Sequence, residues 1–309
     1  KGRPQPPINP ATGARETAHE VYGITELDGF MGLLKDIDEA AAAQGVPASG
    51  ATAEFAPGQY EINLKHEDDV VRAGDHAVML RHLIGTIARK HNFLASFMAK
   101  PFVDQTGNGM HVHCSVLDEK GNTIFNNGTD EGSIQLRHAI GGLQATLPEA
   151  MAIFAPNLNS YRRFGPNLFV PVNGSWGYNN RSVAFRVPNG SPDSRRIEHR
   201  VTGADANPYL VLAAILAGIH HGIVNEIDPG EAMDKNLYDL PAEELKDIPT
   251  VSASLREALE SLDADRDFLK AGGVMDDDQI DAYIELKMEE NMRYEMTPHP
   301  VEYDLYYSV

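Results

Sequence analysis

The chain has 309 residues, of which 42% are hydrophobic and 23% charged, and its formal net charge is −19. This length can bury a substantial core in one large domain or two ordinary ones. The acidic balance argues against nucleic-acid binding through a basic surface, because phosphate neutralisation needs Lys and Arg. No apolar run approaches the ~20 residues that a membrane span needs, so we expect no membrane partner.

Residues 1–25 read as the loop of a truncated start, because they lack the apolar core of a signal peptide and the chain opens without Met. The single cysteine, Cys114, excludes an internal disulfide and fits a reducing cytoplasm, where we expect the protein. Its place in an alternating strand predicts a small buried hydrophobe rather than a nucleophile.

Helical spacing predicts a helix over Glu26–Gly45, which ends on a glycine, and a second helix over Val71–Asn92. Residues 51–65 between them read as strand, Pro-Gly turn and strand. Residues 93–100 are predicted to form a strand, and residues 111–127 a β-hairpin that turns at Lys120-Gly121.

The second half of the chain carries apolar helix patterns over residues 133–154 and 209–227, and a further helix over residues 278–296. The segment from Asn157 to Asn207 has little helical signal. Helices and strands interleave irregularly, and no strand-to-helix turn carries a glycine-rich phosphate loop. The predicted fold class is therefore α+β with antiparallel strands, rather than a doubly wound sheet.

The stretch GNGMHVHCS places the side chains of His111, His113 and Ser115 on one face of a strand, about 7 Å apart at each step. Apolar residues such as Val112 and Cys114 form the opposite face. Two imidazoles on a polar face indicate either a metal site or structural histidines with satisfied hydrogen bonds.

The stretch AEFAPGQYE carries Glu54 and Glu61 on either side of the Pro57-Gly58 turn. A hairpin here would bring the two carboxylates near each other. Paired carboxylates with a histidine make a hard site suited to Mg²⁺ or Mn²⁺. The alternative is two exposed glutamates beside a turn.

A third cluster is basic. Seven arginines and no lysine lie between positions 162 and 200, which favours planar recognition of carboxylate or phosphate over surface salt bridges. Glu198 lies among them and is a candidate metal ligand. Together the three clusters predict a site for a divalent metal, a polyphosphate and a carboxylate substrate. The arginines are Arg162, Arg163, Arg181, Arg186, Arg195, Arg196 and Arg200.

These stretches resemble glutamine synthetase of the bacterial type I class. KPFVDQTGNGMHVHCS resembles the ATP-region signature of that family, and AEFAPGQYE resembles its paired-glutamate metal hairpin. NSYRRF, NNRSVAFRVP and SRRIEHR resemble its arginine segments, and ANPYL, FLKAGGV and MTPHPVEYDLYYSV extend the match. The resemblance runs nearly continuously from Glu54 to Val309 with the motifs in the family's order.

The resemblance implies a catalytic domain over residues 26–309, in which antiparallel strands flanked by helices form the active-site cleft. It also implies ATP and two or more Mg²⁺ or Mn²⁺ ions per site, and identical subunits in a ring, a dodecamer by analogy. The C-terminal DLYYSV is expected to pack at a subunit contact. The family's small N-terminal domain and its Glu-x-Glu metal strand are absent from this sequence.

The resemblance also assigns roles to individual residues. Glu54 and Glu61 match ligands of one metal, and His111 and Glu198 match ligands of the other. His113 matches the histidine near the transferred phosphate. The nucleotide and its phosphates fall to Ser115, Arg181, Arg186 and Arg196, with Arg181 also assigned to catalysis.

Glutamate binding is assigned to Arg163, Arg200 and Gly107, the last beside the substrate amino group. The chemistry implied is phosphoryl transfer from ATP to the γ-carboxylate of L-glutamate, followed by attack of a nitrogen nucleophile on the γ-glutamyl phosphate.

The nitrogen donor is the open question. Ammonia-using members carry a flap glutamate where this chain has Phe169, and many have Asn where it has Thr106. The combination RRF…WGYNNR is similar to the branch that makes γ-glutamyl amides of polyamines, methylamine or other amines. The sequence therefore predicts a glutamate–amine ligase, with true glutamine synthetase as the alternative.

One segment points towards ammonia assimilation. KNLYDLPAEELKDIP resembles the loop whose tyrosine, here Tyr238, is adenylylated in enterobacterial-type glutamine synthetases, which would imply an adenylylating enzyme as partner. The alternative is an ordinary turn. A non-catalytic structural relative is a further alternative, although it would have no need for so many charges facing one cleft.

Overall fold

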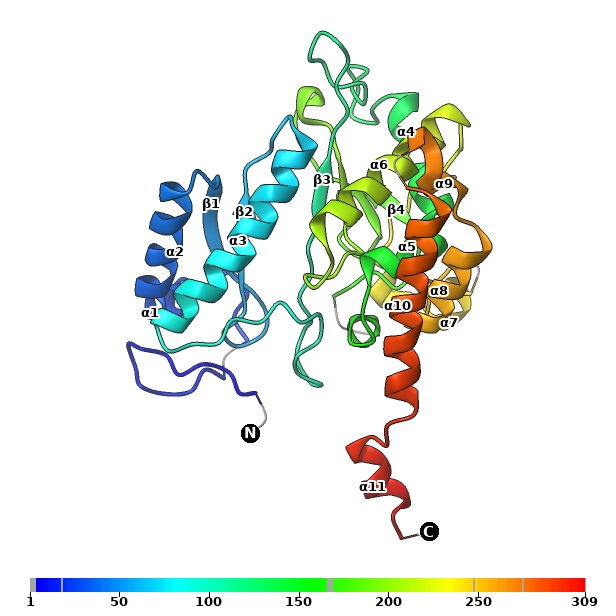
Figure 1. Cartoon of the computed structure of the whole chain (residues 1–309). Coiled ribbons are helices and arrows are strands. Elements are labelled where there is room, and N and C mark those ends of the chain that lie inside the picture. The colour runs from blue at the N-terminus through cyan, green and yellow to red at the C-terminus, as the bar shows by residue number, and fades with distance from the viewer. Residues whose placement is uncertain (1–3, 18, 166–168, 247, 274, 309) are drawn as a thin grey trace. The chain divides into compact units, whose positions relative to one another are not determined.

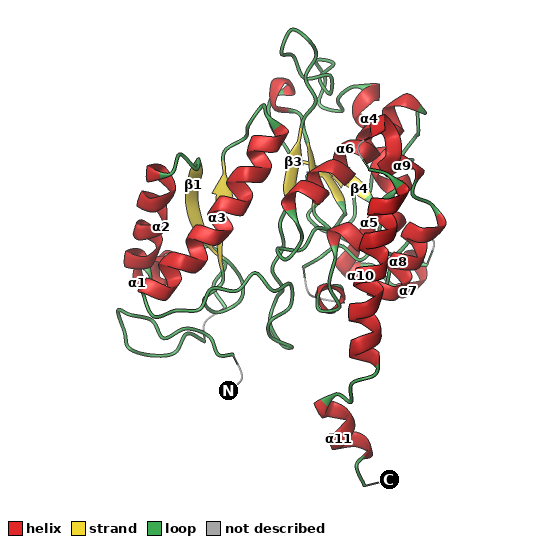
Figure 2. Ribbon diagram, in the orientation of Figure 1, coloured by secondary structure: helices red, strands yellow, loops and turns green. Residues whose placement is uncertain are grey.

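The computed structural model describes residues 4–17, 19–165, 169–246, 248–273 and 275–308 (Figures 1 and 2). The chain divides into two compact units. Unit 1 comprises Lys1–Asn108 and Asn207–Leu212, and unit 2 comprises Gly109–Ala206 and Ala213–Val309. Each unit is described by itself.

Unit 1 is built from helices packed on a β-hairpin. Its elements are α1 (Ile24–Gly29), α2 (Met31–Ala43), β1 (Ala48–Ala53), β2 (Tyr60–Leu64) and α3 (Val70–Lys90). The core is formed by Ile37 and Ala41 of α2 with Leu80, Leu83 and Ile87 of α3. Ile62 and Leu64 of β2 pack against this core, so alternate residues of β2 face away from it.

The predicted hairpin is confirmed: β1 and β2 pair antiparallel, with Thr52 opposite Glu61 and Ala53 opposite Tyr60. Gly58 has φ 71°, a left-handed conformation that glycine adopts without strain, so the Pro57-Gly58 turn can close. The helix predicted over Glu26–Gly45 is in fact two, because Phe30 leaves helical geometry at φ −112°, ψ 14°.

The prediction of a strand over residues 93–100 is wrong. Helix α3 ends as expected, and Asn92, at φ 60°, turns the chain back so that the Phe93 N–H bonds to the Ala88 carbonyl. The following carbonyls of Met98 and Ala99 accept hydrogen bonds from Asn108 instead of from a neighbouring strand. An extended pattern without a strand partner stays a loop.

Unit 2 contains a four-stranded sheet in the order β3-β6-β5-β4. Figure 2 labels its two edge strands, β3 and β4. Its strands are β3 (Val112–Cys114), β4 (Trp176–Tyr178), β5 (Phe185–Val187) and β6 (Ile197–His199). The pairs β3/β6 and β6/β5 are antiparallel as predicted, whereas β5/β4 is parallel. Most of the hairpin predicted over residues 111–127 is irregular, with a single bridge between Leu117 and Thr123, because β3 pairs with the distant β6.

The helices of unit 2 include α4 (Ile134–Ala145), α5 (Leu147–Phe154), α8 (Leu255–Ala264), α10 (Asp277–Glu295) and α11 (Pro300–Tyr306). Two more are single turns, α7 (Ala242–Leu245) and α9 (Asp267–Lys270), and α6 (Pro208–Val224) begins in unit 1. Helix α8 packs on α5 and on α10. The helix predicted over residues 133–154 is split at Thr146, which lies two residues before Pro148. The Thr146 hydroxyl bonds to the Gly142 carbonyl at this break.

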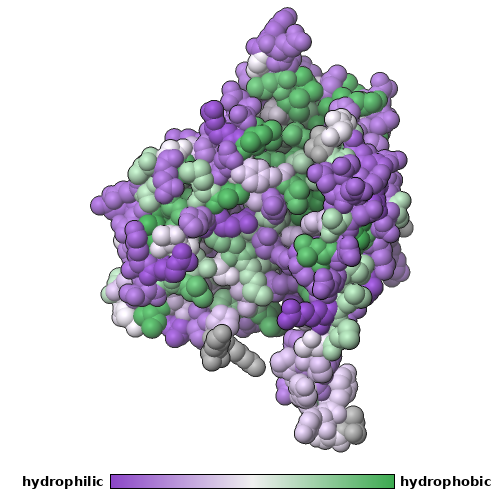
Figure 3. Space-filling view, in the orientation of Figure 1, coloured by the Kyte–Doolittle hydropathy of each residue, from purple (hydrophilic) through white to green (hydrophobic). Residues whose placement is uncertain are grey.

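In the described part of the chain, no helix combines the length and apolar character needed to cross a membrane. Helix α11 carries exposed aromatic and apolar side chains. Tyr303 and Leu305 of α11 and the adjoining Tyr307 are 53%, 61% and 81% exposed. Figure 3 shows this segment mainly in pale purple, which marks residues of weakly hydrophilic type. The predicted C-terminal contact segment is therefore largely uncovered in the single chain, and Val309 lies outside the described residues.

Candidate active site

Three strands of unit 2 bring predicted site residues into one row. His113 of β3 pairs with Glu198 of β6, and Glu198 pairs in turn with Arg186 of β5. Because side chains alternate along a strand, Arg196 and Arg200 share the face of Glu198. This sheet face collects a carboxylate, an imidazole and three guanidinium groups.

His111 and Ser115 extend the same face of β3, two residues to either side of His113. The alternation predicted for this stretch is confirmed, since His111, His113 and Ser115 are exposed where Val112 and Cys114 are half-buried. Burial raises the pKa of the Cys114 thiol to about 11, which fits a packing role.

Glu198 is the electrostatic centre of the face. The residue is 3% exposed, and its side chain accepts hydrogen bonds from Arg186 Nη1 at 2.6 Å and Arg200 Nη1 at 2.7 Å, one on each carboxylate oxygen. Burial raises its pKa, but the charges of Arg200 and Arg186 outweigh that effect and hold the pKa below the ordinary value. The single negative charge of Glu198 is thus shared by the two positive charges of Arg186 and Arg200, so this face keeps a net positive charge.

Both histidines of the face are held in the neutral form. Desolvation, together with the charges of Arg200 and Arg163, lowers the pKa of His111 well below its ordinary value. Desolvation also lowers the His113 pKa; Glu198 opposes this shift, and Arg196 adds to it. His111 Nδ1 lies 3.4 Å from a Glu198 oxygen, and His113 Nδ1 accepts a hydrogen bond from Arg196 Nε at 3.1 Å.

Arg163 provides a buried cation beside this sheet. It lies in the 3₁₀ turn Ser160–Arg163, is 4% exposed and donates to the Val201 carbonyl at 2.6 Å and the Arg200 carbonyl at 3.3 Å. Burial lowers its pKa to about 10. Among the described residues no carboxylate forms an ion pair with it, so the guanidinium can receive a ligand anion.

Gly109 lies close to the end of the Arg163 side chain. A Cβ on Gly109 would lie 2.7 Å from Arg163 Nη2, so a larger residue here would displace the guanidinium group. The second glycine of the GNG stretch thus leaves room for the observed position of Arg163.

The remaining nucleotide-side candidates are less enclosed. Arg181 is exposed and Arg196 half-buried. The Ser115 hydroxyl lies 2.9 Å from the Thr123 hydroxyl and donates to the Arg195 carbonyl at 3.2 Å, so it ties β3 to the segment before β6.

Phe169 and Tyr238, from distant parts of the sequence, meet in unit 2. Their ring centroids are 6.2 Å apart in an edge-to-face arrangement, and Phe169 is 56% exposed. Its φ of 56° is a strained conformation for a bulky residue, of the kind that occurs at functional sites. The Tyr238 hydroxyl is buried and has no hydrogen-bond partner among the described residues, and burial raises its pKa while Arg200 and Arg163 oppose the rise.

In unit 1 the outward face of the hairpin carries the predicted carboxylate pair. Glu61 lies opposite Thr52, and the Glu54 N–H continues the ladder by bonding to the Gln59 carbonyl at 2.8 Å. Glu54, Gln59 and Glu61 therefore share one face, on which diagonal neighbours lie about 7–8 Å apart. The hairpin brings the carboxylates onto one face, as the sequence predicts.

This carboxylate face, defined by Glu54, Gln59 and Glu61, also holds the turn that contains Gly107. The Gln59 side chain bonds to the Gly107 carbonyl at 2.9 Å and to the side chain of Thr106 at 2.9 Å. The sequence motifs alone do not single out Gln59. The signal that could have identified it is its position two residues before Glu61, and hence on the same face.

The donors for a divalent metal are divided between the units. Glu54 and Glu61 are in unit 1, and His111 and Glu198 in unit 2. Within the described residues, no group of three or more His, Cys, Asp or Glu side chains is arranged to hold a metal ion. The donor chemistry of each pair taken by itself fits Mg²⁺ or Mn²⁺, since unit 1 offers two carboxylates and unit 2 a carboxylate with a neutral imidazole.

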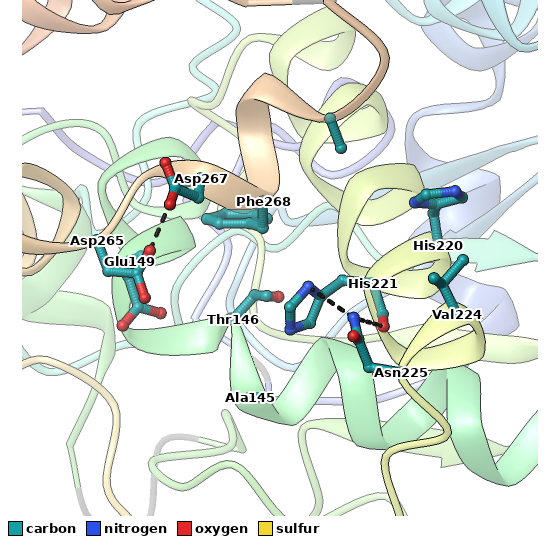
Figure 4. Close-up of a pocket in the computed structure, with 11 residues that line it drawn as sticks. Ala145, Thr146, Glu149, His220, His221, Val224, Asn225, Asp265, Asp267 and Phe268 are labelled. Atoms are coloured by element: carbon teal, nitrogen blue, oxygen red, sulfur yellow. Dashed lines mark hydrogen bonds between the residues drawn. The ribbon is translucent and has the colours of Figure 1, made fainter.

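A separate hollow of unit 2, about 410 Å³ in volume, is lined by acidic side chains rather than by arginines (Figure 4). Helices α4, α5, α6 and α9 contribute to its wall, which includes Glu149, Asp265 and Asp267 beside His220 and His221. None of its described lining residues is Lys or Arg, so it does not suit a phosphate or a carboxylate. The arginine-rich sheet face, in contrast, has the charge that binding of an anion needs.

The sheet face and the hairpin agree with a comparison against known families. The family model described as "Glutamine synthetase, catalytic domain" matches residues 1–306. This chain belongs to the glutamine synthetase family. The predicted family and its catalytic-domain fold are confirmed.

Individual relatives include both kinds of ligase. The chain is 47% identical over 236 residues to the γ-glutamylputrescine synthetase PuuA of Escherichia coli K12, covering 76% of this chain and 50% of that protein. It is 43% identical over 289 residues to a glutamine synthetase of Rhizobium meliloti 1021, covering 93% of this chain and 61% of the relative. The chain thus spans about half to three-fifths of these relatives.

Solved structures of GmaS have a similar fold. A GmaS/ADP complex matches with a TM-score of 0.85 at 27% identity, over 95% of this chain and 67% of that one. A ligand-free GmaS structure matches with a TM-score of 0.84 at 28% identity, with the same coverage of this chain and 66% of the other.

Proposed function

We propose that the protein is an ATP-dependent C–N ligase that activates L-glutamate as γ-glutamyl phosphate and amidates it with an amine such as methylamine or a polyamine. The observation that carries this proposal is the sheet face of unit 2. There, Arg186 and Arg200 share a single carboxylate, Glu198, beside neutral histidines, and the buried Arg163 donates to the Arg200 carbonyl.

In the first step a γ-carboxylate oxygen of glutamate attacks the terminal phosphorus of ATP, a new C–O–P linkage forms, and the bond to ADP breaks. Arg163 and Arg200 would hold the glutamate. Arg181, Arg186 and Arg196 would neutralise charge that develops on the transferred phosphoryl group, with Ser115 on the nucleotide side. The similarity to GmaS, whose structure was solved as a complex with ADP, supports the nucleotide assignment.

His113 would act near the transferred phosphate as a neutral group, because its Nδ1 already accepts from Arg196 and its pKa is lowered. Divalent Mg²⁺ or Mn²⁺, two or more per site, would be held by Glu54, Glu61, His111 and Glu198 and would supply charge stabilisation for the phosphates. In the second step the amine nitrogen attacks the acyl carbon, phosphate leaves, and the nitrogen loses a proton.

The choice of an amine rests on Phe169. An exposed aromatic ring at this place offers apolar contact to an alkyl group and no carboxylate to bind ammonium. The γ-glutamylputrescine synthetase relative accords with it. The glutamine synthetase relatives are equally similar in sequence, and they support the second candidate, an enzyme that uses ammonia.

We further propose a cytoplasmic, ring-shaped homo-oligomer, a dodecamer by family analogy, whose subunits contact one another through the exposed side chains of α11. Adenylylation of Tyr238 by a partner enzyme accompanies the ammonia-using candidate. The buried hydroxyl of Tyr238 would have to become accessible for that modification.

The test is the acceptor profile of the purified protein. ATP- and glutamate-dependent phosphate release is measured with ammonia, methylamine, ethanolamine and putrescine under matched conditions. We expect one of the organic amines to give the highest kcat/KM. Ammonia as clearly the best acceptor would establish the second candidate, and no acceptor-dependent turnover would favour a non-catalytic relative.

A further inference from the structure

The side chain of Gln59 uses its whole hydrogen-bonding capacity at one place. Its Nε2 donates to the Gly107 carbonyl at 2.9 Å and to Asn108 Oδ1 at 2.7 Å. Its Oε1 accepts from the Thr106 hydroxyl at 2.9 Å and the Ala56 N–H at 3.2 Å. Two acceptors on one side and two donors on the other fix the orientation of the amide.

The hairpin does not need this amide for its own closure. The Gln59 backbone N–H bonds to the Ala56 carbonyl at 2.9 Å, and its carbonyl accepts from Glu54 N–H at 2.8 Å, which closes the turn through the main chain. Three of the four side-chain bonds instead reach the Thr106–Asn108 turn, about 50 residues further along the chain. The Gln59 amide therefore mainly holds residues Thr106–Asn108 in position.

The turn has a second anchor, because Asn108 Nδ2 donates to the Met98 carbonyl at 2.8 Å and the Asn108 N–H bonds to the Ala99 carbonyl at 2.8 Å. Asn108 is thus held by the carbonyls of Met98 and Ala99, and Gly107 is held by Gln59 of the hairpin. With Gln59 Nε2 on one lone pair, the Gly107 carbonyl retains a second lone pair for a ligand donor.

Gln59 also lies on the face that carries Glu54 and Glu61, opposite the first and two residues before the second. The same short hairpin thus presents two carboxylates, which favour cations, and an amide that fixes a carbonyl acceptor. Both features suit the ammonium group of an amino-acid substrate.

We propose that Gln59, supported by Thr106, is a positioning residue for the amino-acid substrate: it fixes the Gly107 carbonyl on the carboxylate face of the hairpin so that this carbonyl can receive the substrate ammonium group. The inference rests on the proposed function for the identity of the substrate, L-glutamate. It is independent of whether the nitrogen donor is an amine or ammonia.

Gln59→Glu tests this role in the full-length protein. The variant keeps the shape and an acceptor oxygen but loses both donated bonds, and it sets a carboxylate oxygen against the Gly107 carbonyl and Asn108 Oδ1. We expect the KM for glutamate to rise about tenfold, equivalent to about 1.4 kcal/mol, with the KM for ATP and the Tm unchanged. Thr106→Val, which removes one bond to the amide, is expected to raise the glutamate KM by about threefold.

The matched control is Gln144→Glu in unit 2. Gln144 also donates its amide to a backbone carbonyl, that of Gly174 at 2.8 Å. We expect this variant to leave the glutamate KM unchanged. An unaltered glutamate KM in Gln59→Glu would overturn the inference, as would parallel increases in both KM values with a lowered Tm, which indicate a structural role only.

Calorimetric titration of glutamate in the absence of any acceptor separates this inference from the proposed function. Weaker glutamate binding by Gln59→Glu than by the wild type supports the positioning role, whatever the acceptor profile. Equal affinity of the two proteins refutes that role alone. A wild-type protein that binds no glutamate refutes both proposals.

Discussion

The two faces that carry the candidate site hold their charges in different ways. On the sheet face of unit 2, the buried Glu198 is bonded to Arg186 and Arg200 at 2.6 and 2.7 Å, so its ionised state is imposed by its neighbours. On the carboxylate face of unit 1, Glu54 and Glu61 sit around a neutral amide that holds a backbone turn. One face thus concentrates guanidinium groups and the other carboxylates, and the proposed reaction assigns anions to the first and cations to the second.

The largest effect is expected from Glu198→Gln, which leaves two guanidinium groups without their shared carboxylate. Loss of one partner of a buried ion pair costs about 3–5 kcal/mol, so we expect the free energy of unfolding to fall by that order. Chemical denaturation measures the change. Glu295→Gln is the control, because Glu295 pairs with Arg256 at the surface, and its midpoint should match the wild type. Equal stability of the two variants would contradict the role given to Glu198.

Arg163→Lys keeps the charge of the anion-receiving face but removes the planar fork that donates to the Val201 and Arg200 carbonyls. We expect the KM for glutamate to rise about thirtyfold, equivalent to about 2 kcal/mol. Steady-state kinetics at saturating ATP measures it. The neighbouring exposed Arg162, which packs on Tyr294, provides the control Arg162→Lys with an unchanged KM. Identical kinetics of the two variants would show that Arg163 does not bind the substrate.

Phe169→Glu adds a carboxylate beside the anion-receiving face. We expect the ratio of kcat/KM for ammonia to that for the preferred organic amine to rise about tenfold, because a carboxylate binds ammonium and removes apolar contact for an alkyl group. Phe169→Leu, which retains an apolar side chain, should shift the ratio by less. An unchanged ratio in Phe169→Glu would place acceptor selection elsewhere in the protein.

The smallest effect concerns the acidic hollow of Figure 4. Desolvation raises the pKa of Glu149 above its ordinary value, and its Oε2 is buried with no hydrogen-bond partner in the part of the chain that the structure describes. A raised carboxyl pKa contributes stability below the unfolded-state pKa of 4.5 that is lost as the pH rises through the folded-state value. Glu149→Gln should therefore raise the Tm slightly at pH 7–8, with a difference that shrinks towards pH 4.5. A lower Tm for the variant at pH 7–8 would contradict this account.

The sequence was sufficient for features that depend on short-range spacing. The polar face of His111, His113 and Ser115 follows from the period of two, and the Glu54–Glu61 hairpin follows from its Pro-Gly turn. The row from His113 through Glu198 to Arg186 depends on strand register between segments 12 to 85 residues apart, which no local pattern determines. The family resemblance assigned these residues to one site, but it did not predict which of them contact one another.

The errors have the same origin. Residues 93–100 have a strand-like pattern, but the left-handed Asn92 and the bonds from Asn108 draw them into a loop. The helix over Glu26–Gly45 breaks at Phe30, whose ring packs against Tyr60 and Phe93. In both places tertiary contacts override the local preference of the chain.

The proposed activation of a carboxylate by phosphorylation can be followed by the fate of one oxygen atom. The direct measurement uses L-glutamate labelled with ¹⁸O in the γ-carboxylate, together with ATP and the preferred amine. We predict that one ¹⁸O atom appears in each inorganic phosphate released, because the carboxylate oxygen is transferred to phosphorus before the amine displaces it. Amide product formed with unlabelled phosphate would contradict the account.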